Sequence, residues 1–205
     1  MQGFLAALEE QRWDDHRYYH HNRVNQSLHV VSALCFLTSY VLLFTHPAAA
    51  ALVGWTLAMV SRQIGHFFFE PKGYDDVNQA TFAYKEQIKV GYNLHRKQVL
   101  LGIWALTPLL LLASPSLFGV FEVQPGIESF LDRLSKLWLA LGAGALLFRV
   151  AQLCVIRDVQ TGVVWFVKIL TDPFHDIKLY RGAPLAVLRG ELMDPAHAAR
   201  AESSR

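Results

Sequence analysis

The chain has 205 residues, enough for one substantial domain, and 53% of them are hydrophobic while only 18% are charged. An average soluble protein has roughly 25% charged residues, so this balance, with its apolar residues gathered in blocks, favours a membrane protein. A net charge of +2 without a dense basic run argues against nucleic acid as a partner. The two cysteines, Cys35 and Cys154, are not in CxxC spacing, so we expect buried thiols and no disulfide framework or thiolate metal site.

The N-terminal segment, residues 1–26, lacks a basic stretch followed by a long apolar run, so we expect no cleaved signal peptide. Its apolar residues, such as Phe4, Leu8 and Trp13, alternate with acidic ones in a pattern that predicts an amphipathic helix. Such a helix lies either along the membrane interface or against the cytosolic face of the protein itself.

Apolar runs predict an all-α polytopic membrane protein. A bilayer core requires roughly 20 mostly apolar residues in a helix. Four stretches meet this length: Ser27–Thr45, about Ala48–Phe69, Val99 to about Phe121, and about Leu134–Ile156. We therefore predict four transmembrane helices within a membrane domain of residues 27–156, with a polar loop at 70–98. A shorter apolar piece, Val163–Leu170, is expected to lie at the interface, within a C-terminal segment of residues 157–205 whose end we expect to be disordered.

Basic residues predict the orientation. They are frequent before the first span, in the loop at 70–98 and after Arg157, whereas the turn between the first two spans has none. The positive-inside rule then places both termini and the middle loop in the cytoplasm, at a bacterial inner membrane or an endoplasmic reticulum. In this topology seven of the nine histidines face one side of the membrane.

The stretch HHNRVNQSLH, at the start of the first span, contains two histidines of particular interest, His20 and His29. On a continuous helix the nine positions between them correspond to a rotation of about 900°, which is two and a half turns. The two side chains would therefore lie on opposite faces and point apart. A bend near Asn22 would let the two imidazoles converge. His29 lies inside the apolar run, where an ionisable residue is costly and functional by default. The alternative is that both are ordinary interfacial histidines.

The second span ends in GHFFFE, which places His66 and Glu70 on one helix face, and Gly65 would allow close approach of another helix or a ligand. An imidazole and a carboxylate together suit iron(II). A simple interfacial pair is the alternative. Arg62, one turn earlier, either binds a substrate carboxylate, pairs near Glu70 or extends to the headgroups.

Four further histidines are weaker metal-ligand candidates. His16 and His21 form an HxxxHH spacing with His20, while His95 precedes the third span between basic residues. His175 lies in the sequence DPFHD, which provides a ligand, a carboxylate that orients an imidazole, or a plain turn.

Together these motifs resemble the membrane-bound, iron(II)-dependent 2-hydroxy fatty acid dioxygenases of fatty acid α-oxidation. The resemblance covers about residues 15–70, through the pattern H-x-N-x-x-N-x-x-x-H and the later G-H-x-x-x-E. It implies Fe(2+) as cofactor, a fatty acid and O2 as substrates, and shortening of the acid by one carbon. It further implies His20, His29 and His66 as metal ligands, and includes Asn22 and Asn25, which we expect to support the ligands.

We therefore predict an iron(II)-dependent dioxygenase with Glu70 and Arg62 as catalytic residues, where Arg62 or a loop lysine binds the substrate carboxylate. One alternative is a di-iron lipid hydroxylase or desaturase, suggested by the HxxxHH spacing. Another is a membrane adaptor without catalytic activity. Oligomerisation is compatible with each of these.

Overall fold

The structure is a computed structural model that describes residues 3–70, 72–76 and 78–194, so the predicted disorder at the C-terminal end lies outside the described residues. The protein is all-helical, as predicted, and within the described residues β-structure is confined to two isolated bridges. The elements are α1 (Phe4–Tyr19), α2 (Arg23–Thr45), α3 (Pro47–Leu52), the π-helical η1 (Val53–Met59), α4 (Val60–Ile64), the π-helical η2 (Gly65–Phe69), α5 (Phe82–Ile88), α6 (Leu94–Ala113), α7 (Ile127–Ile156), α8 (Val159–Tyr180) and α9 (Ala183–Leu188).

Three helices, α2, α6 and α7, are long and apolar enough to cross a membrane. The prediction of four such helices is wrong, because the second predicted span, about Ala48–Phe69, is not one α-helix. It consists of α3, η1, α4 and η2 in succession, and none of these pieces has the required length. π-Helical turns inside a helix often occur at functional sites, and η2 contains the GHFFF sequence of the predicted site.

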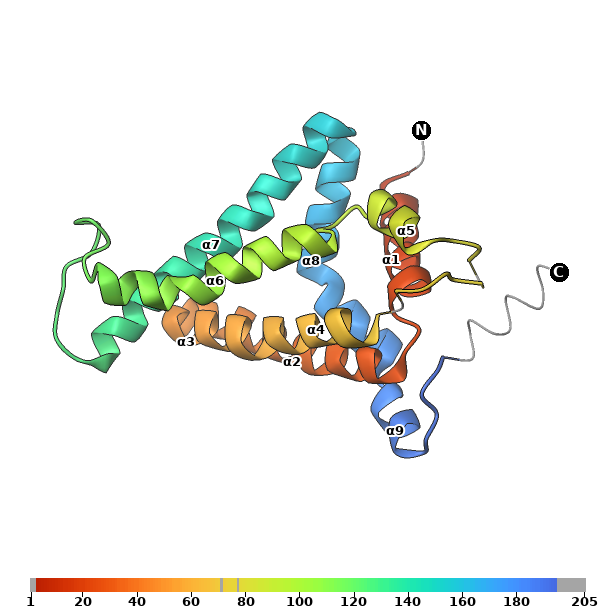
Figure 1. Cartoon of the computed structure of the whole chain (residues 1–205), viewed down its shortest axis with the longest axis horizontal. Helices are drawn as coiled ribbons and strands as arrows, with labels where there is room; N and C mark the ends of the chain where they lie inside the picture. The colour runs from red at the N-terminus through yellow and green to blue at the C-terminus, as the bar shows by residue number, and fades with distance from the viewer. Residues whose placement is uncertain (1–2, 71, 77, 195–205) are drawn as a thin grey trace.

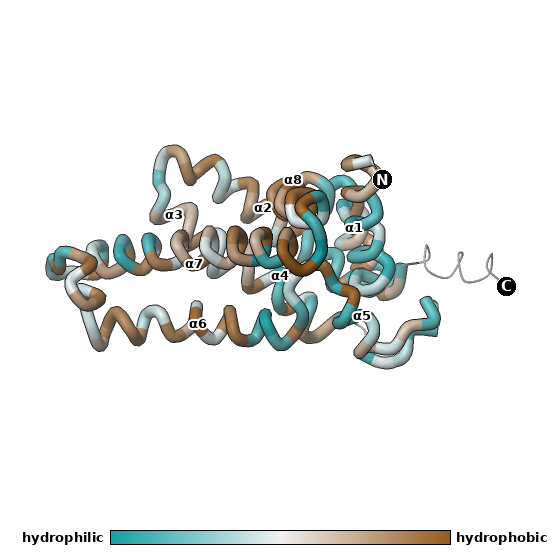
Figure 2. The backbone as a smooth tube through the Cα atoms, turned by 90° about the horizontal axis from the view of Figure 1, so that it is seen from above, coloured by the Kyte–Doolittle hydropathy of each residue, from teal (hydrophilic) through white to brown (hydrophobic). Residues whose placement is uncertain are grey.

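The segment from α3 to η2 runs back along α2, so residues 66–70 lie beside the start of α2 (Figure 1). The helices α6 and α7 meet at the opposite end of the long axis, and α8 returns across α2 to the end that carries α1, α5 and α9 (Figure 1). Hydrophobic residues predominate along most of α6, whereas α1 carries many hydrophilic ones (Figure 2).

An aromatic cluster holds η1, α6 and α7 together. Trp55 and Trp104 are stacked with ring centroids 6.1 Å apart, and Trp55 Nε1 donates a hydrogen bond to the Trp138 carbonyl at 2.7 Å. Leu111 and Leu134 complete the buried core of this cluster. Buried aromatic pairs contribute about 0.5–1.5 kcal/mol beyond the area that they bury. This cluster therefore fixes how α6 approaches the segment that leads to η2.

The helix α8 differs most from the sequence prediction. It continues through Pro173, so the piece predicted over Val163–Leu170 is part of a longer helix and the alternative of a plain turn at DPFHD is wrong. Its start is capped by the Asp158 side chain, which accepts a hydrogen bond from Thr161 N at 2.7 Å. A buried polar stripe with one residue per turn follows: Lys168, Asp172, Asp176 and Tyr180. The other face is apolar and exposed, with Phe174 60% accessible.

The predicted amphipathic N-terminal helix is α1, and it docks on this polar stripe. Lys168 Nζ lies 2.5 Å from an Asp15 carboxylate oxygen and 2.6 Å from Asp172, and Arg12 lies 3.4 Å from Asp172. A buried lysine is tolerated when carboxylates compensate its charge, and these two raise the pKa of Lys168 above its usual value despite burial. Of the two positions expected for this helix, the structure shows the one against the protein itself.

Gly162 allows α7 and α8 to pack closely. A Cβ at this position would lie 2.5 Å from Cys154 Sγ and 3.0 Å from the Val150 carbonyl oxygen. We predict that Gly162→Ala lowers the free energy of unfolding by about 1–3 kcal/mol because backbone atoms must shift. Thermal unfolding in detergent measures this effect. The matched control is Gly144→Ala, where a Cβ meets open space, and it should be neutral or stabilising by up to about 1 kcal/mol. Equal melting temperatures for the two variants would contradict the packing argument.

Candidate metal centre

The chain bends between α1 and α2, as the spacing of His20 and His29 requires. α1 ends at Tyr19, and Asn22 begins α2 as its N-cap, with a side-chain oxygen that accepts from Val24 N at 2.8 Å and Asn25 N at 3.4 Å. Ring centroids of His20 and His29 then lie 4.2 Å apart. The predicted bend is confirmed.

His66 joins these two histidines. Its ring centroid lies 5.4 Å from that of His20 and 5.1 Å from that of His29. One nitrogen from each of the three rings lies within 4.8 Å of the others, and all three side chains are buried. In the part of the chain that the structure describes, these are the metal-binding side chains that come together in this way.

A second layer of polar groups contacts the Nδ1 atom of each ring. His29 Nδ1 lies 3.3 Å from Asp176 Oδ2, and His66 Nδ1 lies 2.7 Å from Glu70 Oε2. An ionised carboxylate only accepts hydrogen bonds, so in both rings Nδ1 is the donor and Nε2 is free of the proton. His20 Nδ1 lies 3.1 Å from the Tyr180 hydroxyl. This is the arrangement by which proteins orient metal-binding histidines.

The remaining ring nitrogens indicate what the cluster can bind. His20 Nε2 and His29 Nε2 are both buried without a hydrogen-bond partner. Leaving a buried polar atom unsatisfied costs about 1–3 kcal/mol, so two such atoms in one cluster point to a missing partner. A divalent cation bound by Nε2 of the three imidazoles would satisfy them and leave further coordination positions open. The residues therefore fit a mononuclear metal ion.

The protonation states also suit a metal. Burial, and after it the neighbouring His29, lower the pKa of His20 well below its usual value, so the ring is neutral near pH 7. A neutral imidazole is the form that binds metal. Burial and the Asp176 carboxylate raise the pKa of Tyr180 well above its usual value, so its hydroxyl keeps its proton.

Glu70 and Arg62, predicted as catalytic residues, both belong to the polar surroundings of the three histidines. Arg62 Nη1 lies 3.1 Å from Asp176 Oδ2, the oxygen that also faces His29. Glu70 Oε1 lies 3.3 Å from Lys89 Nζ, while its other oxygen contacts His66. Both carboxylates, Glu70 and Asp176, therefore bridge an imidazole and a cation.

The two asparagines of the motif shape the backbone. Asn22 caps α2, and Asn25 Nδ2 donates to the Tyr19 carbonyl at 2.9 Å across the bend. A Cβ on Gly65 would overlap the Asn25 side-chain oxygen. The expected close approach at this glycine is therefore present, with α2 as the neighbour.

The weaker histidine candidates lie outside the three-histidine cluster. His16 Nδ1 contacts the Tyr180 hydroxyl at 3.1 Å, so His16 lies beside the cluster without being part of it. His21 faces the Arg17 carbonyl and, at 3.9 Å, Asp75. His95 is exposed at the start of α6, and His175 is partly exposed on α8. The HxxxHH spacing thus does not form a second metal cluster among the described residues.

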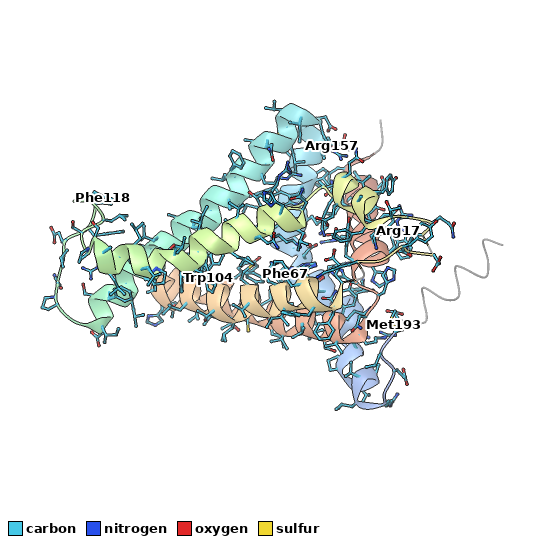
Figure 3. The ribbon with its side chains drawn as sticks, viewed as in Figure 1. Arg17, Phe67, Trp104, Phe118, Arg157 and Met193 are labelled. Carbon is cyan, nitrogen blue, oxygen red and sulfur yellow. The ribbon has the colours of Figure 1, made fainter. Side chains whose placement is uncertain are left out.

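The site and the aromatic cluster are separate along the molecule. Phe67, which follows His66, lies near the middle of the long axis, and Trp104 lies closer to the end marked by Phe118 (Figure 3). Sequence reasoning missed Tyr180 and treated Asp176 only as one possibility for DPFHD. The signal for both was the four-residue spacing of polar side chains along α8.

Comparison with known proteins agrees with the resemblance. Residues 8–84 match the family described as Mpo1-like, 2-hydroxy-palmitic acid dioxygenase Mpo1-like. The matched segment contains all three clustered histidines and Glu70, so the predicted resemblance is confirmed over that part of the chain. Searches of the curated proteins and of the solved structures each found no match. The second-layer residues Asp176 and Tyr180 lie beyond the matched segment.

We predict that Tyr180→Phe weakens divalent metal binding by about tenfold, because the His20 ring loses the hydroxyl that orients it. Competition between the purified protein and a chelator for Fe(2+) or Co(2+) measures the affinity. Tyr40→Phe is the matched control, since it removes a hydroxyl that bonds the Leu170 carbonyl at 3.2 Å and contacts none of the three histidines. An unchanged affinity in Tyr180→Phe would show that the hydroxyl has no orienting role.

Proposed function

We propose that the protein is an iron(II)-dependent dioxygenase that shortens a 2-hydroxy fatty acid by one carbon. The observation that carries this proposal is the convergence of His20, His29 and His66, with two unpaired Nε2 atoms, inside the segment that matches the dioxygenase family. Three histidine ligands with open positions suit non-haem iron(II), which, when bound, supplies the activation of O2. The same ligand set also suits zinc, so the redox chemistry implied by the family favours iron.

The overall reaction balances with molecular oxygen as the only oxidant. A 2-hydroxy acid, RCH(OH)COOH, and O2 give RCOOH, CO2 and H2O. The bond between the carboxyl carbon and C2 is broken, C2 is oxidised to the new carboxyl carbon, and the four electrons released reduce O2. The protein need therefore supply no further reductant.

The residues of the chain have distinct tasks in this proposal. The three histidines hold the metal, while Tyr180, Asp176 and Glu70 fix the orientation of their rings. Arg62 forms an ion pair with Asp176, and Lys89 forms one with Glu70. Burial of the cluster excludes bulk water, which strengthens these electrostatic contacts and protects reactive species from hydrolysis.

The position of the cluster suits a lipid substrate. His29 lies on α2, one of three helices apolar enough to cross a membrane, and His66 lies on the segment that runs back along it. In this arrangement the acid group of a membrane lipid binds at the three histidines while its alkyl chain remains in the bilayer. We propose that this end faces the cytoplasm with both termini, following the basic residues.

The proposal predicts iron in the purified protein and its loss in ligand variants. His29→Ala and His66→Ala should each reduce bound iron and the conversion of 2-hydroxypalmitate to pentadecanoate to background. Elemental analysis and product detection by mass spectrometry measure the two quantities. His95→Ala is the control, because His95 is exposed and does not belong to the three-histidine cluster, and it should retain both. Full iron retention in both ligand variants would refute the proposed site.

A further inference from the structure

The three histidines of the candidate metal centre differ in how their backbones are supported. His29 lies inside α2 and His66 inside η2, so hydrogen bonds within these helices hold both backbones. His20 instead occupies the C-cap position of α1, with φ −117° and ψ 43°, between two helices. The position of its carbonyl group therefore depends on groups outside α1.

The chain returns to this bend after α9. Asn22 and Met193 form an isolated antiparallel bridge there, at the end of the molecule where α2 begins (Figure 3). Arg23 N donates a hydrogen bond to the Leu192 carbonyl at 2.8 Å. Arg23 is the first residue of α2, so its N–H has no acceptor within the helix. The segment after α9 thus satisfies a main-chain group that the bend leaves without a helical partner.

Asp194 adds three contacts to the same bend. Its main-chain N–H donates to the His21 carbonyl at 3.0 Å. Its carboxylate accepts a hydrogen bond from Gln26 Nε2 at 2.7 Å through Oδ2, and its Oδ1 lies 3.3 Å from Arg23 Nη2. The Asp194 side chain is only 11% exposed, so these charge-assisted contacts are largely shielded from water.

Gln26 connects Asp194 to His20. Its buried amide group has two N–H donors, and the same Nε2 atom bonds Asp194 Oδ2 and, at 2.8 Å, the His20 carbonyl. Its Oε1 accepts from Arg23 Nη1 at 3.0 Å. Any rotation of this amide breaks at least one of the three bonds, so the Asp194 carboxylate fixes the amide that holds the His20 carbonyl.

We propose that Asp194 is a positioning residue of the metal centre, which holds the backbone of His20 through Gln26 while Tyr180 holds the ring. This inference rests on the proposed function and deepens it. Loss of the Asp194 carboxylate frees the Gln26 amide and lets the His20 ring move relative to His29 and His66. Residue 194 lies beyond the segment matched by the family, so the assignment comes from the fold of this chain.

The test uses Co(2+) in the purified, detergent-solubilised protein, because its visible absorption spectrum reports the coordination geometry without turnover. Competition with a chelator measures the affinity. Asp194→Ala should weaken Co(2+) binding by about three- to tenfold and shift the absorption bands, since groups that orient a ligand affect both. Asp194→Asn keeps an acceptor for Gln26 and should retain most of the wild-type affinity and spectrum.

Glu191→Ala is the matched control, because it removes an exposed carboxylate from the same segment, and it should change neither quantity. Gln26→Ala should weaken binding at least as much as Asp194→Ala. Adding Asp194→Ala to Gln26→Ala should then have little further effect, since Asp194 acts through Gln26. An undiminished effect of Asp194→Ala in the double variant, or equal effects of Glu191→Ala and Asp194→Ala, would overturn the proposal.

The melting temperature of each metal-free variant separates positioning from general stability. A lower melting temperature in Asp194→Ala with unchanged affinity and spectrum would overturn this inference alone, because the contact would then be structural only. Wild-type protein that binds Co(2+) and Fe(2+) but does not shorten a 2-hydroxy acid would instead refute the proposed function. Wild-type protein that binds neither metal would refute the metal centre and, with it, both proposals.

Discussion

Burial of three imidazoles within contact of one another imposes a constraint on much of the surrounding structure. Each ring has two polar nitrogens, and none of them can be left unsatisfied in the interior without a cost of about 1–3 kcal/mol. The fold satisfies the Nδ1 atoms with Asp176, Glu70 and the Tyr180 hydroxyl. It leaves Nε2 of His20 and Nε2 of His29 buried without a hydrogen-bond partner. A metal ion bound between the rings would give both atoms a partner.

The groups that satisfy Nδ1 impose requirements of their own. Buried carboxylates need cations, and Arg62 and Lys89 provide them. Because Asp176 and Tyr180 belong to α8, that helix must lie against α2 with its polar side inward. α8 is accordingly reversed relative to a water-soluble amphipathic helix, with a buried polar stripe and exposed apolar residues. A helix with an exposed apolar face is stabilised when that face contacts lipid or another apolar surface. This agrees with the membrane association indicated by α2, α6 and α7.

The sequence predicted the part of the site that depends on local spacing. The separation of nine positions between His20 and His29 required a bend, and Asn22 supplies the N-cap at which the helix restarts. The hairpin of the first two apolar stretches brought His66 to the same end. Tyr180 and Asp176 are more than 140 residues away from the first histidine motif, so only tertiary packing brings them there. Sequence periodicity gave no reason to prefer His29 as the partner of Asp176.

The number of spans was wrong for a related reason. Hydropathy counts apolar residues but does not detect π-helical turns, and the stretch at 48–69 has the composition of a span without the continuous α-helix. Its π-helical segments include Gly54 and Gly65. A Cβ added to Gly54 would lie 3.5 Å from Ser39 Oγ, and one added to Gly65 would overlap the Asn25 side chain. Close contact with α2 at these glycines accompanies the altered helical geometry, and at Gly65 it also positions His66.

X-ray absorption spectroscopy at the iron edge of protein purified or reconstituted without oxygen tests the central claim most directly. The account predicts one iron per chain, with multiple-scattering features of about three imidazole ligands and the remaining positions filled by oxygen donors. A site without imidazole scattering, or two irons separated by a short metal–metal vector, would contradict it.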